Sequence, residues 1–419
     1  MKNNGNKTAS RIVAISAGLL AMGAALLAGC SGGGNSSSTS SSATWPPATP
    51  PPTSQVNTYI GTQSPGLYTI TIDHTSNAFS YQDTSAGSAA VSGTFTTAAN
   101  GFLIFSNGGY ALEQLSRAML LAPPVTRTGS GITLGSAPVF AISAPSCQVI
   151  PQQTKFDYLG MASPYFNSSS GESEDGIGSG LIYASTDSTG ADWAFGGELQ
   201  DLLAFPGVSF SPLPDPFTAT CASANSGGPS VIQTAITAPD SIPASFIIGP
   251  TGYLVEDRYS SSNNGNQSFG VSLIGAVAPP SPVSLSALNG ATFLGTQATG
   301  GASGANLPSL AAPQLASLTV SPDSSGKSIE LTGGVFPSND PTQTPGADFA
   351  IDLGAQDPNN NGSFPSVTVK LNTSDGIFYS AGTYNGYALV TNVGGKYTIF
   401  VQAGPVGLGY AVGWTLFQQ

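Results

Sequence analysis

The chain is poor in charged residues, and those it has are mostly acidic. Lys, Arg, Asp and Glu make up 8% of its 419 residues. Three of the ten basic residues lie in the first eleven positions, so the rest of the chain holds seven basic residues against 22 acidic ones. Nucleic-acid binding depends on basic contacts to phosphate, and binding to anionic lipid depends on polybasic segments. The sequence therefore predicts no nucleic-acid partner and no polybasic membrane patch.

Histidine is almost absent, since His74 is the only one. A metal site with two histidines is therefore excluded within one chain, and a Ser-His-Asp triad would have to use His74. No G-x-S-x-G nucleophile elbow occurs. No glycine-rich phosphate loop follows a strand pattern and opens a helix pattern. The sequence leaves enzymatic activity open, assigns no catalytic residue and favours a non-catalytic protein.

Long apolar runs are also lacking, with one exception near the N-terminus. Residues 12–28 form an apolar run, but it is shorter than the roughly 20 strongly apolar residues that a spanning helix needs. Basic residues precede the run, and small residues end it, which is the order found in a secretory signal peptide. The run closes with Leu27, Ala28, Gly29 and Cys30.

These last four residues resemble the lipobox of bacterial lipoproteins. In that family the cysteine thiol receives a diacylglyceryl group, a peptidase cuts before it, and the new amine is acylated, commonly with palmitate. The resemblance implies a signal peptide at residues 1–29, with Cys30 as the first mature residue. Ser31 follows it, which in Gram-negative lipoproteins implies sorting to the outer membrane, with the body on the periplasmic or the cell-surface face. The alternative is an ordinary cleaved signal with a chance cysteine.

Residues 30–54 are predicted to form a tether. Gly and Ser dominate the first half of the segment and Pro the second, a composition of flexible coil followed by extended chain that cannot bury a core. At about 3.3 Å per residue, the tether reaches at most about 80 Å.

Only three cysteines occur, and Cys147 and Cys221 remain if Cys30 is acylated. Outside the cytoplasm, such a pair reads most simply as one disulfide. Two buried free thiols are the alternative.

The remainder is typical of an all-β protein. Short runs such as LYTITID, GFLIF and SVTVKL alternate apolar and polar residues between Gly, Asn and Ser, which predicts antiparallel meanders. We expect a barrel, a sandwich or a propeller-like body, with little helix. Only residues 110–121 have helix-like spacing, and a strand pair is the other interpretation. Residues 101–113 resemble residues 245–256, so the body is either duplicated or repeats a common hairpin. Two β-rich halves, residues 55–240 and 241–419, are expected.

One loop suggests a metal. The segment DPNNNGS, residues 357–363, matches the start of a calcium loop, with oxygen ligands at Asp357, Asn359 and Asn361 and Gly362 at the bend. Thr368 stands where an EF-hand has its bidentate Glu. Calcium is therefore one hypothesis, and a hairpin loop without a cofactor is the other.

Aromatic residues beside Gly, Ser and Asn suggest a binding surface for sugars or peptides. They are Tyr158, Tyr165, Trp193, Tyr253, Tyr259 and Tyr387. We expect an outer-membrane-anchored, non-catalytic lipoprotein that serves in envelope structure or binds a glycan or an envelope protein. In its richness in Gly, Ser and Ala, the mature region resembles proteobacterial lipoproteins of unknown function. The alternative is an extracytoplasmic hydrolase that cleaves glycans with a pair of carboxylates.

Overall fold

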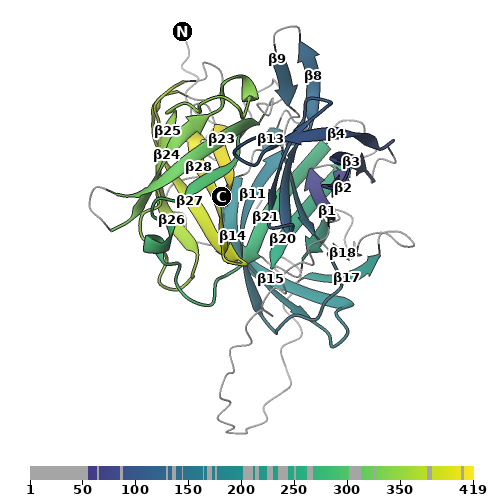
Figure 1. The fold of residues 1–419 in the computed structure, drawn as a ribbon. Helices are drawn as coiled ribbons and strands as arrows, with labels where there is room; N and C mark the ends of the chain where they lie inside the picture. Colours follow the sequence, from purple (N-terminus) through teal and green to yellow (C-terminus); the bar gives the residue numbers. More distant parts are fainter. Residues whose placement is uncertain are drawn as a thin grey trace, which may run out of the picture. The chain divides into compact units, whose positions relative to one another are not determined.

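The structure is a computed structural model that describes most of residues 55–419. Residues 1–54, which hold the expected signal peptide, Cys30 and the tether, lie outside the description. So do residues 64–65, 85–87, 129–130, 135–137, 144, 164, 168–171, 175–176, 202–210, 213–216, 224–229, 235–243, 250–251, 262–267, 302–312, 324–326, 375–379 and 407–409. In Figure 1 the described strands follow the sequence from purple to yellow.

The first eight-stranded sheet closes on itself and is called here the N-terminal barrel. Its strands pair in antiparallel chain order, and β1 pairs with both β2 and β10 to close the ring. A separate hairpin, β8 with β9, is inserted between β7 and β10. The barrel strands are β1 Val56–Gln63, β2 Gly66–Asp73, β3 Ala78–Asp83, β4 Val91–Thr97, β5 Leu103–Phe105, β6 Tyr110–Gln114, β7 Ala118–Ala122 and β10 Val139–Ser143. The inserted hairpin consists of β8 Pro124–Thr128 and β9 Gly131–Leu134.

The second sheet, the middle sheet, has nine strands and also turns back on itself. Its order runs from β14 to β16, and the additional pairing of β14 with β15 joins eight of the strands in a ring. The small hairpin of β12 and β13 lies between β11 and β14 in the chain. The strands of the sheet are β11 Thr154–Ser163, β14 Ile177–Thr186, β15 Asp192–Asp201, β16 Ser211–Pro212, β17 Phe217–Ser223, β18 Ser230–Thr234, β19 Ala244–Ile248, β20 Tyr253–Ser261 and β21 Ser268–Val277. The hairpin consists of β12 Tyr165–Asn167 and β13 Glu172–Glu174.

The third sheet, the C-terminal barrel, is again an eight-stranded antiparallel meander, closed by the pairing of β22 with β29. Two short 3-10 turns, η1 Leu285–Leu288 and η2 Pro337–Asn339, accompany it. Its strands are β22 Thr292–Gly301, β23 Gln314–Pro322, β24 Ile329–Val335, β25 Phe349–Asp352, β26 Ser363–Leu371, β27 Gly382–Val393, β28 Lys396–Val406 and β29 Tyr410–Gln418.

The all-β prediction is confirmed, and the architecture is built from barrels. No α-helix occurs in the described residues. Among the same residues, no helix is long and apolar enough to cross a membrane. The same eight-stranded meander order appears in both closed barrels.

Each closed barrel is filled by its own apolar side chains. In the N-terminal barrel, Phe79 and Phe105 stack with ring centroids 3.9 Å apart, within a cluster that also holds Ile70, Met119 and Val139. In the C-terminal barrel, Trp414 contacts Phe349 edge to face at 5.3 Å. Close packing of this kind stabilises the rings.

A shared apolar cluster joins the three sheets on their outer faces. It contains Leu120 and Phe140 of the N-terminal barrel, Tyr253 of the middle sheet, and Phe400 and Phe417 of the C-terminal barrel. The Phe140 ring centroid lies 5.4 to 6.0 Å from those of Tyr253, Phe400 and Phe417. All described residues belong to one compact unit.

The segment 110–121 is a strand pair rather than a helix. β6 and β7 pair through a turn at Leu115 and Ser116. Every residue of β7 is buried, because Leu120 packs in the shared cluster while Met119 and Leu121 pack inside the barrel. Burial on both faces removes the period-two alternation that identifies a strand in the sequence.

The echoing segments 101–113 and 245–256 lie in two hairpins that share one backbone hydrogen bond. In each, the amide of the last turn residue, Gly108 or Gly252, donates to the carbonyl three residues earlier. Both glycines have positive φ, 90° and 85°, a conformation that glycine adopts without steric cost. The expected boundary between residues 240 and 241 lies outside the described residues, and the strands that flank it, β18 and β19, pair with each other.

Candidate functional site

The single histidine closes a polar cluster at one end of the N-terminal barrel. His74 follows β2, and its Nε2 lies 2.7 Å from Glu113 Oε2 on β6. Tyr59 Oη donates to Glu113 Oε1 at 2.5 Å, and Asn57 Nδ2 donates to the same oxygen at 3.0 Å. The His74 ring also meets Phe95 edge to face, with centroids 5.6 Å apart.

This arrangement fits a structural role better than a catalytic one. Both Glu113 oxygens are engaged by neighbours, which stabilises the carboxylate in place. Tyr59 is fully buried, and burial, followed by the Glu113 charge, raises its pKa, so the hydroxyl stays protonated as a donor. The His74 side chain is 39% exposed. It lies one residue beyond the end of β2, as expected for a histidine at a strand end.

The proposed calcium loop packs against the middle sheet. Its turn is closed by the Asp357 amide donating to the Ser363 carbonyl at 2.9 Å, and Gly362 has a φ of 85°, which fits the expected bend. Asp357 Oδ1 accepts the Asn359 amide at 2.8 Å, while Asn361 Nδ2 donates to the Pro279 carbonyl at 3.1 Å.

Calcium binding by these residues stays a prediction. Lys155 Nζ donates to the Asn359 carbonyl at 3.3 Å, which places a cation beside the loop. No group of three or more His, Cys, Asp or Glu side chains that could hold a metal ion occurs in the part of the chain described.

Beneath the same loop lies a buried carboxyl group. Asp157 is 3% exposed, and Asn360 Nδ2 donates to its Oδ1 at 2.5 Å. Burial raises the Asp157 pKa to about 7, helped by the Asp357 charge and opposed by the Asn360 hydrogen bond and the Lys155 charge. Asp157 and Asp357 are thus neighbouring carboxylates, but a substrate cannot reach a group covered in this way.

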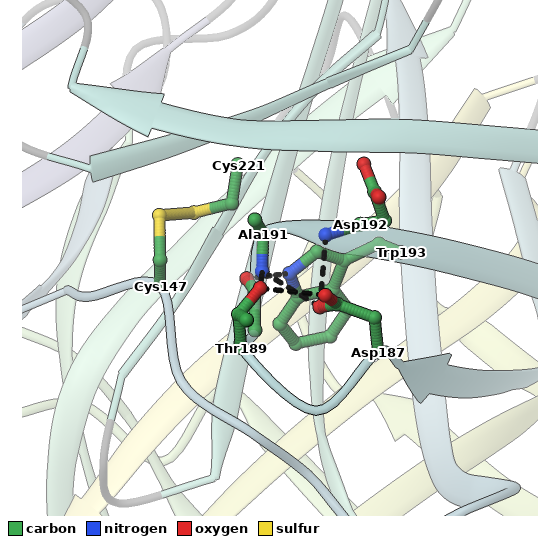
Figure 2. Close-up of a disulfide and its surroundings, with 8 residues drawn as sticks. Cys147, Asp187, Thr189, Ala191, Asp192, Trp193 and Cys221 are labelled. Carbon is green, nitrogen blue, oxygen red and sulfur yellow. Dashed lines mark hydrogen bonds between the residues drawn. A yellow bond between two sulfur atoms is a disulfide. The ribbon is translucent and has the colours of Figure 1, made fainter.

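The two cysteines form the expected disulfide, with Cα atoms 5.6 Å apart. Figure 2 shows it beside the turn from Asp187 to Asp192 that joins β14 to β15. The carboxylate of Asp187 organises this turn, because it accepts bonds from the Thr189 hydroxyl at 2.6 Å and the Ala191 amide at 2.9 Å.

An open hollow of about 500 Å³ adjoins this turn and is lined in part by Asp187, Asp192 and Thr218. The hydrogen bond from the Thr189 hydroxyl leads the interactions that lower the Asp187 pKa. A glycosidase needs one carboxyl that stays protonated as an acid. The lowered pKa of Asp187 does not fit that role.

Three of the six aromatic residues expected to form a binding surface are buried. Trp193, Tyr253 and Tyr387 are at most 1% exposed, so for these three residues the prediction is wrong. They pack in apolar clusters because strand residues beside Gly turns point inward as often as outward. The side chains of Tyr158, Tyr165 and Tyr259 lie outside the described residues.

The candidate binding site is a cleft of about 650 Å³ on the outside of the C-terminal barrel. Buried Leu294 and Phe336 contribute apolar surface. The described residues that line it carry no ionisable side chain. They are Ala99, Asn100, Gly101, Thr292, Leu294, Ser317, Phe336, Gln343, Thr344, Pro345 and Gln419.

The turn before β5 forms one wall of the cleft. Gly101 has a φ of 97°, and its amide donates to the Ala98 carbonyl at 2.9 Å. Asn100 Nδ2 donates to the Pro341 carbonyl at 2.8 Å, which ties the N-terminal barrel to the loop after η2. The turn is therefore held in position by a bond to the opposite wall.

Sequence reasoning missed this cleft entirely. Its residues come from three distant stretches, residues 99–101, 292–345 and the last residue. Asn, Gln, Thr and Ser at these positions match no motif.

Comparison with known proteins adds distant likenesses only. No protein-family model and no curated protein matches the sequence. A protein of unknown function from the DUF3598 family of Nostoc punctiforme aligns at 10% identity and a TM-score of 0.22, over 63% of this chain and 95% of that one. Transferrin binding protein B from Neisseria meningitidis aligns at 13% identity and a TM-score of 0.28, over 84% of this chain and 66% of that one.

A double mutant of transferrin binding protein B from Haemophilus parasuis aligns at 9% identity and a TM-score of 0.28, over 88% of this chain and 76% of that one. Likenesses at these TM-scores carry no argument about what the present chain does.

Proposed function

We propose that this chain is a lipoprotein anchored in the outer membrane through Cys30, and that its β body binds a ligand or an envelope partner without catalysing a reaction. The anchor rests on the order of signal elements that ends at Cys30. Several acyl chains hold a protein far more firmly than one, at about 0.8 kcal/mol per buried methylene. The tether lets the body stand clear of the bilayer.

The observation that carries the non-catalytic role is the neutral lining of the cleft. Amide, hydroxyl and apolar side chains form its described walls, and none of these side chains can serve as the acid or base that bond cleavage needs. The apolar filling of both closed barrels supports the same role, because it leaves binding to the outer surface.

Fractionation of a Gram-negative host tests the anchor. Full-length chain should appear in the outer-membrane fraction, and the Cys30→Ser variant should be lost from that fraction. Ser31→Asp is the matched control, because it keeps the acylated cysteine and should move the protein to the inner membrane. A Cys30→Ser protein that still reaches the outer membrane and carries no acyl mass contradicts the anchor.

A turnover assay tests the absence of catalysis. Detergent-extracted protein is incubated with envelope polysaccharides and short oligosaccharides, and reducing ends are counted. No release above that of a boiled sample is expected. Release that persists in independently purified samples would establish the hydrolase alternative instead.

A further inference from the structure

We propose that the cleft walled by Asn100, Gln343 and Gln419 is a binding site for a neutral oligosaccharide. This inference rests on the proposed binding function and adds to it a site and a class of ligand. The cleft is open to solvent, and its volume of about 650 Å³ gives room for about two or three sugar rings bound with one face in water.

Each of the three carboxamides of the cleft donates one hydrogen bond to the protein, which restricts its orientation. Asn100 Nδ2 donates to Pro341 O at 2.8 Å, Gln343 Nε2 to Asp340 Oδ2 at 3.0 Å, and Gln419 Nε2 to Phe417 O at 3.1 Å. A carboxamide has two N–H donors and an acceptor oxygen, so each retains a second N–H. Pre-orientation lowers the entropy lost when a ligand binds.

A hydroxyl-rich ligand complements this lining. Sugar hydroxyls donate and accept at once, and the cleft offers both amide donors and oxygen acceptors. Leu294 and Phe336 add apolar surface for the C–H face of a ring. An anionic ligand would lose hydration without meeting a cationic side chain in the described walls.

A peptide fits the same cleft less well. An extended peptide binds by adding a strand to an exposed sheet edge. The strands beneath the cleft have no exposed edge there, because β22 pairs with β23 and β29 and β23 pairs with β24. Recognition must therefore come from side chains, which suits a ligand with polar groups all around it.

Ligand-observed NMR on the full-length detergent-extracted protein tests the proposal with a panel of neutral gluco-, galacto-, manno- and N-acetylhexosamine oligosaccharides. At least one should bind. Gln343→Ala should raise its Kd about tenfold, as loss of one hydrogen bond does. Ser317→Trp, on a half-buried wall position, should abolish binding. Thr368→Trp is the matched control, because Thr368 is an exposed position of β26 in the same barrel outside the cleft.

Each other result overturns the inference. Binding that survives Ser317→Trp would place the sugar site elsewhere, and the proposed binding function would stand. Peptides that bind the parent but not Ser317→Trp, while no sugar binds, would replace the ligand class. No binding by any oligosaccharide would remove the assignment, and cleavage of the bound sugar would contradict the non-catalytic function itself.

Discussion

Tyr253 Oη of the middle sheet donates a hydrogen bond of 2.7 Å to Gln114 Oε1 of the N-terminal barrel. Thr398 of the C-terminal barrel lies 2.6 Å from the same hydroxyl. Gln114 Nε2 also donates to the Tyr397 carbonyl at 3.1 Å. Tyr253 is 0% exposed and Gln114 3%, so one buried polar group joins all three sheets inside their shared apolar cluster.

Removal of the Tyr253 hydroxyl should therefore loosen the junction of the sheets. Tyr253→Phe keeps the ring packing and should lower the free energy of unfolding by about 1–2 kcal/mol, measured by urea denaturation. Tyr384→Phe is the control, because that hydroxyl bonds the Ser380 carbonyl at the exposed surface and its loss should cost less than about 0.5 kcal/mol. Equal effects of the two variants would contradict a stabilising role for the junction.

The turn between β6 and β7 carries backbone strain that substitution can relieve. Leu115 and Ser116 have φ of 49° and 55°, and the Arg117 amide donates to the Gln114 carbonyl at 2.8 Å, as in a type I′ turn that favours Asn and Gly. Leu115 is 42% exposed, so little packing is lost. Leu115→Asn should raise stability by about 0.5–1 kcal/mol.

Val149→Asn serves as its comparison. Val149 is 55% exposed and does not have a positive φ, so the same loss of exposed apolar surface occurs there without relief of strain. Its thermal midpoint should stay within about 1 °C of the parent. A midpoint for Leu115→Asn that does not rise above that of Val149→Asn would rule out the strain.

Stability should fall as pH rises through the range in which Asp157 titrates. Its pKa is raised by burial from 3.8 to about 7 in the folded chain, so the folded state binds more protons than the unfolded state between these values. The stability that protonated Asp157 contributes is fully present below about pH 3.8 and is lost as the pH rises through 7. Between pH 5.5 and 7 the loss should be about 2 kcal/mol.

Asp157→Asn isolates this effect. Asn cannot ionise, and it can pair with Asn360, whose Oδ1 is buried without a hydrogen-bond partner. Denaturation at several pH values should show the decline between pH 5.5 and 7 removed in the variant. Lys155 and Asp357, the charged groups near this carboxyl, are unchanged in it, so an undiminished decline would assign the pH dependence to other groups.

The disulfide should contribute strongly to stability, since it closes a loop between residues 74 apart in sequence. In the chain-entropy view such a loop stabilises by about 4 kcal/mol. Replacing both cysteines by serine should lower the unfolding free energy by this order. Addition of reductant should destabilise the parent and leave the double variant unaffected, and a parent that ignores reductant after full thiol release would contradict the contribution.

The sequence predicts the strands of this protein better than their closure into rings. Alternating runs such as β26 show their period directly, with Val367, Val369 and Leu371 buried and the residues between exposed. β7 does not, because both its faces are buried. Closure depends on pairings such as Tyr59 with Ser143 and Leu294 with Phe417, and nothing local in the chain encodes partners so far apart.

The sequence predicts the candidate site less well than it predicts the fold. The pairing of Cys147 with Cys221 followed from counting cysteines. The neutral cleft, in contrast, assembles Asn100, Gln343 and Gln419 from distant segments, and each of these residue types is common on surfaces. His74 stood out by its rarity, yet its partner Glu113 lies 39 residues away on a strand whose register the sequence does not reveal.

The most direct test of the central claim is the mass of the N-terminal peptide of the protein extracted from host membranes. Acylation should leave a mature chain that begins at Cys30, with a peptide mass raised by a diacylglyceryl group and one amide-linked fatty acid. Alkaline hydrolysis should then remove only the two ester-linked chains. A chain that begins at another residue, or a Cys30 peptide of unmodified mass, would contradict the anchor on which the proposed function depends.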